Sequence, residues 1–197
     1  VWYKDLSPEE VKQKKIRNEG EQLEMLKTSV FDKFLNNDFI AARTSSYDDI
    51  KNKIDNIILE RETGVSICAF DEVGDTTGVI YEKKTEEVLE RNRKEEGGKL
   101  KHGLKLEDGK LALGPVHNLP IFYLALPKRL IQQGIQAMDP SFQGKSENDI
   151  NLFDYFTSTI DQQIKRLKLE RHLNPDLKAR LEHFEEILAR IRNKEKR

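Results

Sequence analysis

The sequence has very little cysteine and almost no net charge. Cys68 is the one cysteine among 197 residues, so an intrachain disulfide is excluded. It lies in the apolar run 65–70, where a reduced and buried thiol is expected. The 34 Lys and Arg residues nearly cancel the 35 Asp and Glu residues, so no strong overall field selects an anionic or a cationic partner.

Long apolar runs are also missing. None approaches the roughly 20 residues that a membrane-spanning helix needs, and residues 1–5 do not resemble a signal peptide. We therefore expect a cytoplasmic protein that makes no membrane contact. The charges that are present divide unevenly, because residues 45–90 hold 12 acids against 5 bases. The middle of the chain is thus the acidic part.

The first 140 residues are expected to form a mixed α/β domain. Ser7 as N-cap, followed by Pro8 and Glu10, predicts the start of a helix that reaches about residue 36. Short apolar runs predict strands at 39–42, 54–59 and 66–71, with a hairpin turn at 62–64. A charged helix at 76–96 follows, then two strands on either side of an Asp108-Gly109 turn. A strand at 119–126 and a helix at 127–138 complete the domain.

Residues 141–197 are expected to form a C-terminal helical extension. Apolar residues recur at helical spacing in two segments that are separated by Asn174-Pro175, which predicts two antiparallel helices. The predicted buried positions are Phe156, Ile160, Ile164, Leu181, Phe184 and Leu188. Packing against each other and the domain is favoured over a coiled-coil partner, although a homodimer or protein partner through these helices stays open.

Acidic residues interrupt or follow two of the apolar strands. Asp55 lies within the predicted strand 54–59, and Asp71 and Glu72 lie where the next one, 66–71, ends. Acids on adjacent hairpin strands can converge at one end of a sheet, and buried carboxylates need a cation, a basic partner or solvent. Mg²⁺ is held by one or two carboxylates together with water and phosphate oxygens. This arrangement is the one used for metal-assisted phosphodiester hydrolysis.

The chain here resembles the PD-(D/E)XK nuclease superfamily, over roughly residues 20–126. The resemblance lies in Gly20-Glu21-Gln22-Leu23-Glu24, Thr44-Ser45-Ser46-Tyr47-Asp48-Asp49, Ile54-Asp55-Asn56-Ile57-Ile58 and Ile67-Cys68-Ala69-Phe70-Asp71-Glu72-Val73. It implies a restriction-endonuclease-like central mixed sheet flanked by helices. It also implies a nuclease that uses Mg²⁺ or Mn²⁺ on DNA or RNA.

The resemblance also implies roles for particular residues. Asp55 and Asp71, with Glu72 beside them, would bind the metal, and Glu24 on the first helix would assist, with Glu21 as the alternative. The family places a lysine two residues after the second acid, where this chain has Val73. Lys84 or Lys83 would have to replace it, with its ammonium within a few ångströms of the Asp71 carboxylate.

A second hypothesis keeps the fold without the chemistry. The missing lysine favours a catalytically silent binding or scaffolding module that uses the C-terminal helices as its contact surface. Asp55 would then pair with Lys51 or Lys53, and Asp71 and Glu72 would form a solvated strand end. Asp48 and Asp49 are most simply turn or helix-cap residues. The four histidines have no ligand spacing, so a zinc site is not expected.

Overall fold

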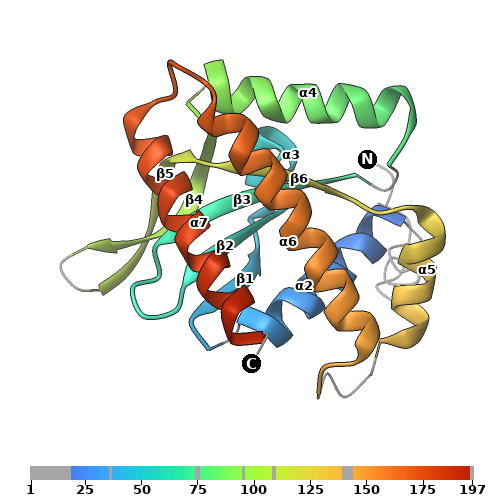
Figure 1. Ribbon diagram of the computed structural model, residues 1–197. Helices are drawn as coiled ribbons and strands as arrows, with labels where there is room; N and C mark the ends of the chain where they lie inside the picture. The colour runs from blue at the N-terminus through green and yellow to red at the C-terminus, as the bar shows by residue number, and fades with distance from the viewer. Residues whose placement is uncertain are drawn as a thin grey trace, which may run out of the picture.

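A four-stranded mixed sheet lies at the centre of the protein (Figure 1). The computed structural model describes residues 19–195 except 36, 74–75, 95, 108–109 and 139–143. The sheet has the order β1-β2-β3-β6. The first three strands are antiparallel neighbours, whereas β6 runs parallel to β3. Their bounds are β1 Phe39–Arg43, β2 Asn56–Glu60, β3 Ser66–Val73 and β6 Ile121–Ala125.

These strands confirm the α/β class and the expected hairpin. In that hairpin β2 pairs with β3, and Asn56 lies opposite Phe70. Gly64 in the turn has φ 66°, a conformation that glycine adopts without steric cost. The helix start predicted at Ser7 lies outside the described residues, and the described helix begins at Glu19.

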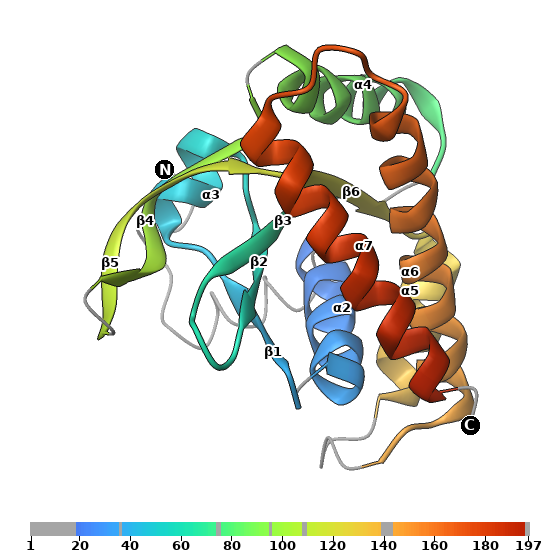
Figure 2. The same ribbon diagram turned by 60° about the vertical axis from the view of Figure 1, so that its left-hand side comes forward.

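Three helices pack on one face of the sheet, and a fourth packs against two of them (Figure 2). Aromatic rings form the centre of this core: Phe31 from the first helix contacts Phe70 of β3 and Phe153 and Phe156 of a C-terminal helix. The core is continuous from the first helix to the last. The helices are α2 Glu19–Leu35, α5 Lys128–Ala137, α6 Glu147–Lys168 and α7 Pro175–Glu195.

The opposite face carries a smaller core beneath the charged helix α4 (Gly78–Lys94). Val88 of this helix packs with Ile57 and Ala69 of the sheet. The base of a two-stranded ribbon, β4 (Gly98–Glu107) and β5 (Lys110–Leu119), completes this core. The short helix α3 (Ser46–Asn52) packs against β4. The ribbon confirms the second predicted hairpin, although its Asp108-Gly109 turn lies outside the described residues. The candidate site lies on this side of the sheet.

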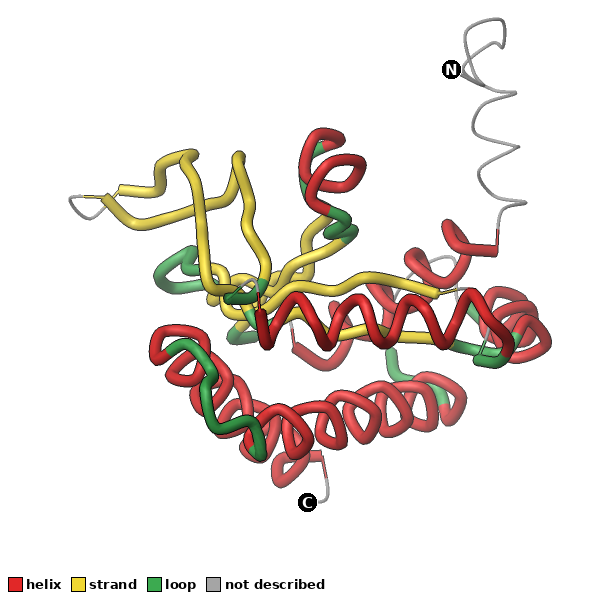
Figure 3. Tube along the Cα trace, turned by 90° about the horizontal axis from the view of Figure 1, so that it is seen from above, coloured by secondary structure: helices red, strands yellow, loops and turns green. Residues whose placement is uncertain are grey.

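The C-terminal hairpin packs as predicted. All six apolar positions named for it are buried, with exposed fractions of 0–4%. Figure 3 shows α6 and α7 side by side along one side of the strands. Phe184 of α7 contacts Phe122 of β6 with ring centroids 5.5 Å apart, so the hairpin shares one core with the sheet. No helix in the described ranges is both long and apolar enough to cross a membrane.

Truncating Phe184 tests this shared core. We expect Phe184→Ala to lower the free energy of unfolding by about 3 kcal/mol, because the side chain is 1% exposed and its removal leaves a cavity. Urea unfolding followed by circular dichroism measures the loss. Leu169→Ala is the control, since Leu169 is 82% exposed and its truncation should change stability by less than about 0.5 kcal/mol. Equal effects of the two substitutions would contradict the described packing.

Candidate functional site: a carboxylate pair beside a lysine

Asp55 and Asp71 meet where β2 begins and β3 nears its end. Asp55 directly precedes β2 instead of lying within the strand. Its N–H donates to the Phe70 carbonyl at 3.0 Å, and its Oδ2 accepts from the Glu72 N–H at 2.9 Å. Both bonds lie beyond the last ladder pair, Asn56 and Phe70. Asp55 is therefore tied to the two residues that flank Asp71 in β3.

The two carboxylates belong to the same face of the sheet. Side chains alternate along a strand, so Asp55 shares a face with Ile57, and Asp71 shares one with Ala69. Ile57 and Ala69 both belong to the core under α4. Burial, and after it the nearby charge of Asp71, together raise the pKa of Asp55 to about 6. Two like charges that act on each other in this way favour a bound proton or a bound cation.

Lys84 supplies a cation to this pair from α4. Its Nζ lies 2.7 Å from Asp71 Oδ2, and its side chain is 27% exposed. This confirms the expected approach of a helix lysine to Asp71 and selects Lys84, because Lys83 is exposed. Burial nevertheless raises the pKa of Asp71, which the hydrogen bond and charge of Lys84 only partly offset. The Asp71 carboxyl is almost completely buried, at 3% exposure.

Glu72 and Glu24 lie in a separate polar cluster on the α2 side. Glu72 follows Asp71 in the strand and so points to the other face, where its carboxylate contacts Lys27 Nζ. Asn56 Nδ2 donates to Glu24 Oε1 at 3.0 Å and to Glu72 Oε1 at 3.2 Å. The guanidinium of Arg43 lies 2.6 Å from Glu24. The structure thus brings Asp55, Asp71 and Lys84 together, whereas Glu24 and Glu72 are held by other partners.

The donor set limits how a metal could bind. Across the described part of the chain, no group of three or more His, Cys, Asp or Glu side chains is arranged to hold a metal ion. Asp55 and Asp71 fit a cation that takes most of its ligands from water and phosphate, as Mg²⁺ does. Such a cation would compete with Lys84 for the Asp71 carboxylate.

Sequence reasoning missed Lys27, which is the largest buried polar side chain of this region. It is 1% exposed, and burial lowers its pKa to about 7, although the carboxylates of Glu24 and Asp55 act in the opposite direction. Its Nζ also lies 4.9 Å from the centre of the Phe70 ring. The available signal was its position one turn after Leu23 in the apolar stripe of α2, where a lysine needs a buried partner.

The two acids interpreted as turn residues have different surroundings. Asp48 caps its own helix together with Ser45, and it also accepts from the Lys101 and His102 N–H groups at 2.7 and 3.1 Å. It therefore ties α3 to β4. Asp49 is exposed, and burial together with the charge of Asp55 raises its pKa, which shows that Asp49 lies near the pair. No spacing rule in the sequence connected Asp49 with Asp55.

Comparisons with known proteins add no relative. No protein-family model, no curated protein and no solved structure matches this chain.

Proposed function

We propose that the protein is a divalent-metal-dependent nuclease with a restriction-endonuclease-like fold. The observation that carries this proposal is the pair Asp55 and Asp71 on one face of adjacent strands, with Lys84 2.7 Å from Asp71. A mixed sheet with helices on both faces supports the fold, and two adjacent carboxylates support one Mg²⁺ or Mn²⁺.

Each side chain has a distinct chemical task in this proposal. Asp55 and Asp71 would hold the cation, which when bound supplies a Lewis acid for the phosphoryl oxygen and lowers the pKa of water. Lys84, displaced from Asp71, would donate a hydrogen bond to the attacking water or to a phosphate oxygen. Glu24 would keep Asn56 and Arg43 in place at the edge of the site. Lys84 thereby takes the role of the lysine that is missing at Val73.

A silent binding module is the second candidate, and one observation favours it. Asp71, Glu72 and Glu24 each have a cationic partner already, in Lys84, Lys27 and Arg43. Buried carboxylates that are paired in this way need no metal. In this case the partner would be a protein or a second copy of the chain, and it would contact the outer surface of α6 and α7.

A cleavage panel separates the two candidates. Purified protein would be incubated with single- and double-stranded DNA and RNA in 5′- and 3′-labelled forms, with Mg²⁺, with Mn²⁺ or with EDTA. We expect metal-dependent cutting of at least one substrate and none in EDTA. No cutting of any substrate, together with no heat of Mn²⁺ binding in calorimetry, would exclude the nuclease and leave the silent module.

Metal binding should depend on pH through Asp55. Its pKa is about 6 in the metal-free protein, so above pH 6 the carboxylate is already ionised and binding releases little or no proton from it. Below pH 6 the cation must displace a proton, and we expect Mn²⁺ affinity to fall about tenfold per pH unit. Calorimetry at pH 5.0, 6.0 and 7.5 in buffers of different ionisation heat measures affinity and proton release. A constant affinity across this range would contradict a ligand role for Asp55.

A further inference from the structure

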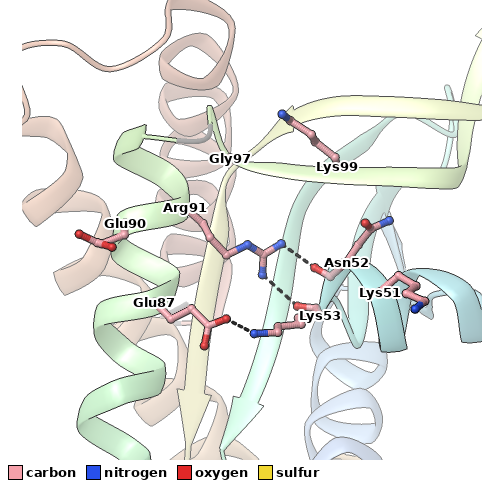
Figure 4. A pocket seen from close by; sticks show the side chains of 8 residues that line it. All are labelled: Lys51, Asn52, Lys53, Glu87, Glu90, Arg91, Gly97 and Lys99. Carbon is pink, nitrogen blue, oxygen red and sulfur yellow. Dashed lines mark hydrogen bonds and ion pairs between the residues drawn. The ribbon is translucent and has the colours of Figure 1, made fainter.

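A cavity of about 280 Å³ lies beside the carboxylate pair, between α3, α4 and the base of β4 (Figure 4). One buried water needs only about 10–15 Å³ by the same kind of measure, so the cavity has room for a polyatomic ligand. Most of the side chains around it are charged. They are Lys51, Asn52, Lys53, Glu87, Glu90, Arg91, Gly97 and Lys99.

The acids of this cavity form ion pairs, whereas three of its cations form none with the residues that the structure describes. Lys53 pairs with Glu87, as Figure 4 shows, and Lys94 outside the cavity pairs with Glu90. Arg91 donates to the backbone carbonyls of Asn52 and Lys53, at 2.6 and 3.2 Å, which carry no net charge.

Lys51 and Lys99 are the other two cations of the cavity that form no ion pair with the described residues. Both are exposed at the rim. Together with Arg91, whose charge acts on Glu87 and Asp71 without an ion-pair contact, they make three cations that form no ion pair with the described residues. Such a set attracts an anion, and Arg91 can in addition bind two phosphate oxygens at once if its carbonyl contacts are exchanged.

The cavity and the carboxylate pair are linked along one side of α4. Lys84, Glu87 and Arg91 are three and then four residues apart, which places them on the same side of the helix. At 1.5 Å per residue, Arg91 lies about 10 Å along the axis from Lys84. The charges of both Arg91 and Glu87 act on Asp71. A strand whose phosphate lies at Asp71 would therefore pass the cavity.

We propose that this cavity binds a backbone phosphate of the nucleic acid, next along the strand from the phosphate at Asp55 and Asp71. This inference rests on the proposed function. The cavity would orient the strand, and it would do so without a metal ion, because its cations are side chains. Lys51 and Lys99 are then positioning residues of the substrate, separate from the residues that hold the cation.

Fluorescence anisotropy with a labelled 20-nucleotide DNA in EDTA tests this inference without any cutting. The variant is Lys51→Ala/Lys99→Ala, and the matched control is Lys165→Ala/Lys178→Ala, which removes two exposed lysines from α6 and α7. We expect the cavity variant to bind at least tenfold more weakly and the control within twofold of wild type. The slope of log affinity against log salt should fall by about 1 in the cavity variant.

Each outcome decides the inference. Equal weakening by both pairs, or no weakening by either, overturns it, because the lysines would then only balance the negative C-terminal ends of α3 and α4. Loss of DNA binding in the cavity variant alone supports it. The nuclease proposal can fail while DNA binding by the cavity holds. This would be the result if the wild-type protein bound DNA in EDTA through the cavity but bound no Mn²⁺ and cut no substrate. Metal-dependent cutting that is unchanged in the cavity variant would remove the inference and leave the nuclease.

Discussion

Asp71→Asn is expected to abolish metal-dependent cutting and to weaken Mn²⁺ binding. Asparagine keeps the size of the side chain but removes the charge that would hold the cation, and a metal ion contributes several kcal/mol to such a reaction. The expected loss of rate is about 10³-fold or more. Cutting is measured on the best substrate of the panel, and Mn²⁺ binding is measured by calorimetry.

Stability and a matched control make the Asp71 result interpretable. Asp71→Asn leaves Lys84 without its carboxylate partner, so urea unfolding must show that the variant is still folded. Asp154→Asn removes an exposed acid from α6 and should retain wild-type cutting and binding. Cutting by a folded Asp71→Asn protein at the wild-type rate would place the chemistry elsewhere in the molecule.

Lys84→Met is expected to separate metal binding from catalysis. The substitution keeps an unbranched chain and removes the ammonium that would act on water or phosphate, so we expect a loss of cutting rate of about 10²- to 10⁴-fold. Mn²⁺ affinity should be kept or increased, because the cation no longer competes with Lys84 for Asp71 Oδ2. Single-turnover cutting rates and calorimetry measure the two effects.

Lys83→Met is the matched control for Lys84. Lys83 is its neighbour on α4 but is exposed, so its replacement should change neither quantity by more than about twofold. If Lys84→Met cut as fast as Lys83→Met, Lys84 would not replace the lysine that is missing at Val73. The Asp71 and Lys84 contact would then be a structural ion pair.

Local patterns were sufficient to predict the hairpin and the carboxylate pair. The apolar runs around Ile58 and Cys68, with a Gly64 turn between them, specify two antiparallel strands. Their pairing shifts by one residue between Ile58 and Leu59, so the register at the acids depends on this irregularity as well as on the turn. Once that register is set, Asp55 and Asp71 are placed on one face by the alternation of side chains. The apolar stripe of the C-terminal helices predicted their buried side for the same reason, because a helix must cover its apolar face.

The partners of the acids depend on packing between elements and were harder to predict. Glu72 and Lys27 are 45 residues apart, and their contact depends on how far α2 is shifted along the sheet. The choice of Lys84 over Lys83 had a signal that went unused. Lys84 lies one helical turn before Val88, which is a buried apolar residue of α4, so Lys84 is on the side of the helix that faces the sheet. Lys83 lies one turn before Glu87, on a different side.

Anomalous diffraction from crystals grown with Mn²⁺ would show whether Asp55 and Asp71 hold one cation between them. We predict one anomalous peak within about 2.0–2.6 Å of carboxylate oxygens from both Asp55 and Asp71, the range of hard divalent cations. Lys84 Nζ should then have moved off Asp71 Oδ2, from its present distance of 2.7 Å. The claim would be contradicted by crystals with saturating Mn²⁺ that show no peak between these two side chains, and in which Lys84 still holds Asp71.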